Sequence, residues 1–111
     1  MIKFAFMIKR LPSLKLEEFI QYHRDQHAPL FMSIPETKQY VRIYTVSHPV
    51  DSRDYPASTF DGLTEIWFDS WEDHDLFFAS ENYKNKVQPD PSKFFDEKGM
   101  SMTVTKETVV F

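Results

Sequence analysis

Residues 60–69 read FDGLTEIWFD, and their large apolar side chains alternate between the two sides of an extended chain. Ile66 and Phe68 share one side of this predicted strand, whereas Leu63 and Trp67 share the other. An exposed sheet face that carries large apolar groups is an association surface. The pattern therefore predicts a sheet with helices on one face and a second copy of the chain on the other.

The segments on either side complete a recurring order of strands and helices. The apolar spacing predicts strands over residues 2–9, 37–46, 60–69 and 100–110, and helices over residues 15–27 and 71–79. Residues 47–59 read as a long loop, Pro29 predicts a kink or a second short helical piece, and residues 81–95 contain a turn or two of helix. This order predicts one α+β domain over residues 1–111 with ferredoxin-like βαββαβ topology, a four-stranded antiparallel sheet with both helices on one face.

The composition excludes several kinds of partner. Thirteen Lys and Arg against 17 Asp and Glu give a net charge of −4, which offers no electrostatic footprint for nucleic acid or an anionic membrane. No stretch approaches the roughly 18 apolar residues of a membrane span, and the first ten residues read as a strand rather than a signal peptide. The cytoplasm is the expected location, and the lack of cysteine fits its reducing conditions.

The residue types available for chemistry are few. Without cysteine, the chain forms no thiolate nucleophile and no cysteine-ligated metal site, and Gly62 and Gly99 alone cannot build a phosphate-binding loop. We therefore expect no cofactor, with histidines and carboxylates as the catalytic groups. Aromatic residues make up 16% of the chain, and such side chains line pockets for flat ligands or fill a dimer surface.

Two histidines lie on the apolar face of the first predicted helix. His23 and His27 fall in the same stripe as Phe19 and Ile20 when residues are placed about 100° apart. An unpaired buried imidazole costs about 1–3 kcal/mol, so each ring is either hydrogen-bonded to the protein or functional. His27 lies near the helix end, where the helix dipole and burial shift its pKa in opposite directions, which suits a general acid or base. Two ligands do not make a metal site, and we expect none.

Acidic and phenolic side chains alternate with apolar ones on two predicted strands. Asp61 and Glu65 share a side with Trp67, either paired with an arginine or lysine, or with Glu65 orienting His27. Tyr40 and Tyr44 share a side of the preceding strand with Arg42, where the phenols either pack in the core or bind a substrate oxygen.

Four segments resemble the EthD family. They are Lys9–Pro12 (KRLP), Leu16–Phe19 (LEEF), Tyr22–Leu30 (YHRDQHAPL) and Phe60–Phe68 (FDGLTEIWF). The resemblance implies a dimeric α+β barrel, a superfamily that includes monooxygenases, muconolactone isomerases, polyketide cyclases and haem enzymes. It makes His27 the signature histidine and Tyr40 the tyrosine of the second strand. Some isomerase-like members have a cysteine where this chain has Ile66, which argues against methylmuconolactone isomerisation.

The leading hypothesis is a homodimeric, cofactor-independent lyase or isomerase that acts on a small aromatic, polyketide-like or lactone substrate by decarboxylation, dehydration, cyclisation or isomerisation. It assigns proton transfer to His27 and an orienting role to Tyr40 and Glu65. Substrate binding is assigned to His23, Tyr44, Trp67 and Asp61. Two alternatives remain open: a non-catalytic accessory protein that binds a hydrophobic metabolite, and a cofactor-free or haem-dependent monooxygenase.

Overall fold

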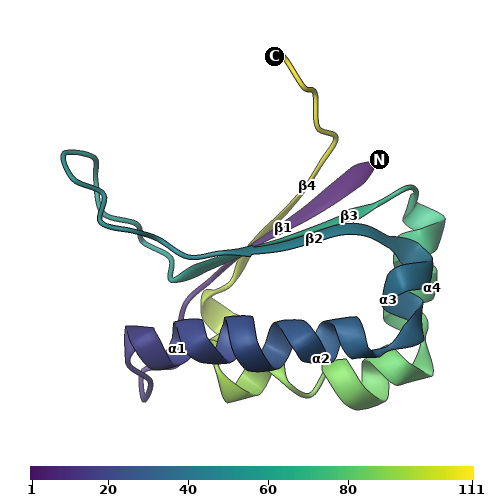
Figure 1. The fold of residues 1–111 in the computed structure, drawn as a ribbon, viewed down its shortest axis with the longest axis horizontal. Helices are drawn as coiled ribbons and strands as arrows, with labels where there is room; N and C mark the ends of the chain where they lie inside the picture. Colours follow the sequence, from purple (N-terminus) through teal and green to yellow (C-terminus); the bar gives the residue numbers. More distant parts are fainter.

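The computed structural model describes residues 1–111 and is built on one antiparallel sheet. Its strands are β1 (Ile2–Ile8), β2 (Val41–Ser47), β3 (Gly62–Phe68) and β4 (Ser101–Thr105), in the spatial order β2-β3-β1-β4. The helices lie against one face of this sheet, and the opposite face is left open (Figure 1). The ferredoxin-like α+β fold expected from the sequence is confirmed.

The helical layer is made of short pieces. They are α1 (Leu16–Tyr22), η1 (His23–His27), α2 (Ala28–Ser33), α3 (Pro35–Tyr40), α4 (Trp71–Ala79), η2 (Tyr83–Val87), η3 (Pro91–Lys93) and η4 (Glu97–Gly99). The segment η1 is a π-helical turn, in which the Ala28 N–H donates to the His23 carbonyl. Because this wide turn accommodates Pro29, α1, η1 and α2 form a nearly continuous helix to Ser33. The expected second helical piece after Pro29 is α2.

One predicted strand begins four residues too early. Residues 37–40 were expected to be extended, but they belong to α3, and β2 begins at Val41. Pro35 starts this helix at a position where its missing N–H costs nothing, and the Thr37 hydroxyl donates to the Phe31 carbonyl. The β-branched and aromatic residues that suggested a strand here are therefore overridden by a helix start. The last strand is also shorter than expected, because β4 ends at Thr105.

The core lies between the sheet and the helices. Phe4, Ile66 and Phe68 of the strands pack with Phe31 and Phe77 of the helices, and all five are buried. The open face of the sheet carries the odd-numbered residues of β1 and β3, including Lys3, Leu63, Glu65 and Trp67. The alternation read from residues 60–69 is thus confirmed.

Two segments extend beyond the body of the molecule. The connection between β2 and β3 forms a long arm, and the chain after β4 rises on the open side of the sheet (Figure 1). No helix is both long and apolar enough to cross a membrane.

Candidate functional site

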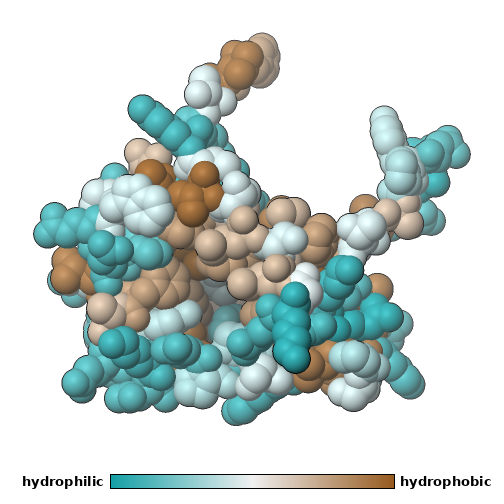
Figure 2. Space-filling model, turned by 180° about the vertical axis from the view of Figure 1, so that it is seen from behind, coloured by the Kyte–Doolittle hydropathy of each residue, from teal (hydrophilic) through white to brown (hydrophobic).

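A cavity of about 300 Å³ lies between the sheet and the helical layer. Ten of its sixteen lining residues are hydrophobic, and the others are His23, His27, Thr64, Gln88, Pro91 and Glu97. Figure 2 shows the molecule hollowed on the face opposite to that of Figure 1, with apolar side chains gathered around the hollow. The site is a mostly apolar pocket that holds a small number of polar groups.

His27 is held by a buried carboxylate. The His27 Nδ1 and Asp90 Oδ2 atoms lie 2.8 Å apart, and the exposed fractions of the two side chains are 11% and 7%. The Tyr22 hydroxyl donates to the other Asp90 oxygen at 2.7 Å. Burial, followed by Asp90, raises the pKa of Tyr22 to about 12, so this phenol remains a donor. The exposed Lys93 ammonium lies 3.7 Å from the same oxygen.

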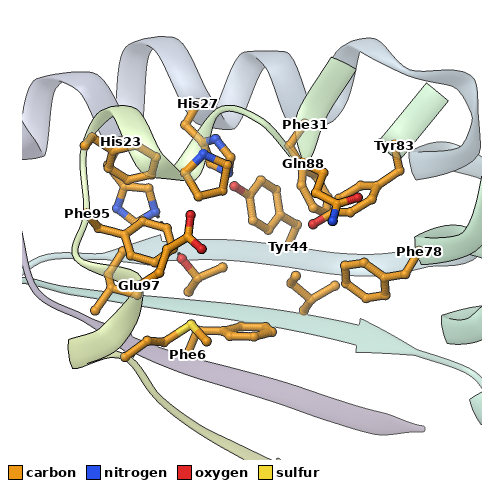
Figure 3. Close-up of a pocket in the computed structure, with 16 residues that line it drawn as sticks. Phe6, His23, His27, Phe31, Tyr44, Phe78, Tyr83, Gln88, Phe95 and Glu97 are labelled. Atoms are coloured by element: carbon orange, nitrogen blue, oxygen red, sulfur yellow. Dashed lines mark hydrogen bonds between the residues drawn. The ribbon is translucent and has the colours of Figure 1, made fainter. Parts of the chain in front are cut away.

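The Asp90 contact fixes the tautomer of His27. Because a carboxylate only accepts hydrogen bonds, Nδ1 of His27 carries the proton and the lone pair lies on Nε2, which has no partner within the chain. Burial lowers the pKa of His27, and the opposing effect of Asp90 is smaller. His27 is thus a neutral imidazole at neutral pH, oriented as a proton acceptor at the cavity (Figure 3).

His23 is a second, more constrained imidazole. Its Nδ1 lies 2.9 Å from His48 Nε2, and its Nε2 lies 3.0 Å from the Thr64 hydroxyl. The residue is 1% exposed, and burial, followed by the neighbouring His48 and His27, lowers its pKa to about 3. Because both ring nitrogens are occupied, His23 fastens η1 to the sheet rather than offering a free base.

Aromatic rings form the walls of the cavity around His27 and His23. Phe94 lies 5.0 Å from the His27 ring and 5.3 Å from the His23 ring, centroid to centroid. Tyr44 of β2 stacks on Phe31 at 4.1 Å. The hydroxyl of Tyr44 is fully buried and has no hydrogen-bond partner, and burial raises the pKa of this phenol.

The structure brings together only part of the predicted site. His27, His23 and Tyr44 line the cavity. Tyr40 does not, because it ends α3 and packs at the edge of the main core cluster. Arg42 was expected to share a side with the two tyrosines but lies where the β2 register shifts, and it binds Asp69 at 2.6 Å.

Glu65 and Trp67 of β3, and Asp61 just before it, do not line the cavity. Glu65 pairs with Lys3 at 3.0 Å on the open face, so its expected role as the orienter of His27 is corrected in favour of Asp90. Asp61 accepts from the backbone N–H of Arg10 at 2.8 Å, and Trp67 lies beneath the Lys3 ammonium. Both carboxylates form ion pairs, Glu65 with Lys3 and Asp61 with Arg10, as one of the two interpretations from the sequence expected.

Sequence reasoning missed Asp90, His48 and Thr64. Asp90 lies 63 positions from His27 along the chain, in a segment without regular periodicity, so no local pattern connects the two residues. The one available signal was an acidic residue between Pro89 and Pro91, just before the aromatic pair Phe94 and Phe95. His48 is 25 positions from His23 in the sequence, although it follows directly after β2 and contacts His23 there. No group of three or more His, Asp or Glu side chains is arranged to hold a metal ion.

Comparisons with known proteins agree with this architecture. The family model described as EthD domain matches residues 11–98. Among solved structures, an EthD family protein from Bacillus halodurans superposes with a TM-score of 0.71 at 22% identity, covering 97% of this chain and 100% of that one. An EthD-like protein from Ralstonia eutropha superposes with a TM-score of 0.70 at 17% identity, covering 99% of this chain and 94% of that one.

More distant structures share the fold alone. A protein from Bacteroides fragilis, described as dimeric, of unknown function and with a ferredoxin-like fold, gives a TM-score of 0.68 at 11% identity, covering 96% of this chain and 95% of that one. An antibiotic biosynthesis monooxygenase superposes with a TM-score of 0.60 at 12% identity, covering 98% of this chain and 100% of that one. No match was found among curated proteins.

Proposed function

This chain belongs to the EthD family, and we propose that it is a cofactor-independent lyase or isomerase that uses His27 to move a proton on a small, flat, oxygenated substrate. The observation that carries the proposal is the His27–Asp90 pair at the wall of an apolar cavity. A neutral imidazole whose Nδ1 donates to a carboxylate presents Nε2 as a base, and the carboxylate stabilises the imidazolium as it forms. Asp90 is a positioning residue in this scheme.

The reaction begins with a carbon acid beside a carbonyl group. His27 Nε2 takes the proton, the C–H electron pair becomes a C=C bond, and the carbonyl electrons move to oxygen. Return of the proton at another carbon of a conjugated enolate re-forms the carbonyl and gives isomerisation. Departure of a β-hydroxyl group as water, with the proton that His27 had accepted, gives dehydration. Both outcomes use the same base, so the reaction class proposed here is proton transfer at carbon rather than one named conversion.

The proposal includes a homodimer formed through the open sheet face. Leu63, Trp67 and the exposed Ile43 lie on that face, where no helix covers them. An apolar face of this kind favours association with a second copy. The Bacteroides fragilis neighbour, which shares this fold, is described as dimeric, and this supports a dimer of the present chain.

The test measures proton exchange at carbon rather than a particular product. Hydroxylated aromatic ketones and unsaturated lactones are incubated in D₂O with wild-type protein, and loss of the α-proton signal is followed by NMR. We expect exchange of at least one compound with wild type and at least about 100-fold slower exchange with His27→Gln. Compounds that bind both proteins equally and never exchange would contradict the proposal and favour the non-catalytic accessory protein.

A further inference from the structure

We infer that the Tyr44 hydroxyl is the second fixed contact of the cavity, where it donates a hydrogen bond to the carbonyl oxygen of an uncharged aromatic ketone or lactone. The inference deepens the proposed function, because it names the substrate class of the same site. It concerns binding, so its test requires no turnover.

The first observation is the unsatisfied hydroxyl itself. The oxygen of Tyr44 is buried and makes no hydrogen bond with any group of the chain. Buried polar atoms are nearly always paired, so an unpaired one on a residue that lines a cavity indicates an absent partner. The ring is fixed by its stack on Phe31, so the hydroxyl cannot easily turn away to find another partner.

The second observation is the direction in which the hydroxyl points. Figure 3 shows the hydroxyl end of Tyr44 directed toward His27 across the cavity. A carbonyl oxygen bound by Tyr44 would therefore place its neighbouring carbon on the His27 side of the pocket. Burial keeps the phenol protonated by raising its pKa, so Tyr44 acts as a donor and not as an anion.

The third observation is the charge of the lining. Glu97 is its one formally charged residue, it is solvent-exposed, and no lysine or arginine lines the cavity. The two histidines offer no compensating cation, because burial keeps both imidazoles neutral. Lys93 approaches Asp90 but does not line the cavity.

This lining discriminates against carboxylates. An anionic ligand would lose its hydration in an apolar pocket and gain no positive partner. An uncharged carbonyl compound loses much less hydration free energy, and it gains the Tyr44 hydrogen bond. Among the reactions open to a His27 base, the lining therefore favours isomerisation, cyclisation and dehydration over decarboxylation, whose substrate carries a carboxylate.

The experiment compares three probes of nearly equal shape by calorimetry. They are 2-acetylnaphthalene, 2-ethylnaphthalene and 2-naphthoate, measured with wild type, Tyr44→Phe and Tyr40→Phe, the last being a tyrosine outside the cavity. We expect wild type to bind the ketone about 5- to 10-fold more tightly than the ethyl compound, and to bind the carboxylate more weakly than the ketone. Tyr44→Phe should lose the preference for the ketone over the ethyl compound, and Tyr40→Phe should keep it.

A spectroscopic measurement isolates the hydrogen bond. The carbonyl stretch of bound ¹³C-labelled 2-acetylnaphthalene should lie at lower wavenumber in wild type than in Tyr44→Phe. Carboxylate binding as tight as ketone binding in wild type would overturn the inference, and this comparison does not depend on any variant folding. The inference would also be overturned if Tyr44→Phe kept the preference for the ketone over the ethyl compound. The same holds if wild type failed to bind the ketone up to the ketone's solubility limit. If ketones bind through Tyr44 but no compound of the exchange panel loses its α-protons, the proposed function alone is overturned.

Discussion

At the residue scale, the site is defined by what each imidazole contacts. His27 and His23 lie four positions apart on one helical stripe, and the sequence favoured His27 as the base because of its place near the helix end and the resemblance to the EthD family. The structure distinguishes them, because His27 has one nitrogen on Asp90 and one without a partner, whereas both His23 nitrogens are engaged. Periodicity predicted that both residues face inward. It could not identify Asp90, since that contact joins distant parts of the chain.

Replacing Asp90 tests its positioning role. Asp90→Asn removes the charge that raises the pKa of His27, so the midpoint of the His27 titration should move to lower pH in NMR spectra. The same variant should slow carbon-proton exchange by about 100-fold or more, because an amide can donate to Nδ1 and favour the wrong tautomer. Tyr22→Phe, which leaves the carboxylate in place, is the matched control and should have a smaller effect. An unshifted His27 titration in Asp90→Asn would contradict this role.

The buried histidines make stability depend on pH. The pKa of His23 is lowered from 6.5 to about 3, so the unfolded chain takes up a proton before the folded chain does. The free energy of unfolding is therefore unaffected by the protonation of His23 above pH 6.5. As the pH falls from 6.5 toward 3, protonation of His23 in the unfolded chain lowers it by about 1.4 kcal/mol per pH unit at most. The free energy of unfolding, measured by urea titration at pH 7, 6 and 5, should therefore fall more steeply with decreasing pH for wild type than for His23→Gln. Equal slopes in the two proteins would show that His23 does not contribute.

At the element scale, strand alternation was a better guide than residue propensity. The period of two along residues 60–69 gave the strand, its two faces and the uncovered side of the sheet. The same reasoning failed at residues 37–40, where Thr37 and Tyr40 suggested a strand although Pro35 and Glu36 start a helix. The π-helical turn η1 could not be foreseen, because it depends on how the helix packs around Pro29 and His23.

The start of α4 provides a test at this scale. The Ser70 hydroxyl accepts from the Asp73 N–H at 3.2 Å and so caps the N-terminus of α4. Ser70→Ala should lower the free energy of unfolding by about 1 kcal/mol in urea titrations. Ser13→Ala, at an exposed serine with no such bond, should change it by less than about 0.5 kcal/mol. Equal effects of the two variants would mean that the cap does not stabilise α4.

At the scale of the whole molecule, the two faces of the sheet have different roles. The inner face supplies the core and the floor of the cavity, while the outer face combines apolar residues with the Lys3–Glu65 pair. We expect the outer face to be covered by a second copy of the chain. Ile43→Lys should therefore shift the protein toward monomer in sedimentation equilibrium. Leu76→Lys, at a residue of α4 with nearly the same exposure (46% against 45%), should not. A monomeric wild type, or a dimer that tolerates Ile43→Lys, would contradict this arrangement.

The central claim is that His27 is a neutral base whose free nitrogen faces the cavity. Long-range ¹H–¹⁵N NMR of the histidine rings tests it most directly, since the two nitrogens of each tautomer have distinct shifts. At pH 7 we expect His27 to show a protonated Nδ1 and a bare Nε2, with a titration midpoint below 6.5. Addition of a ketone that exchanges its α-protons should perturb the Nε2 signal. A His27 ring protonated on Nε2 at pH 7, or one that carries both protons, would contradict the account.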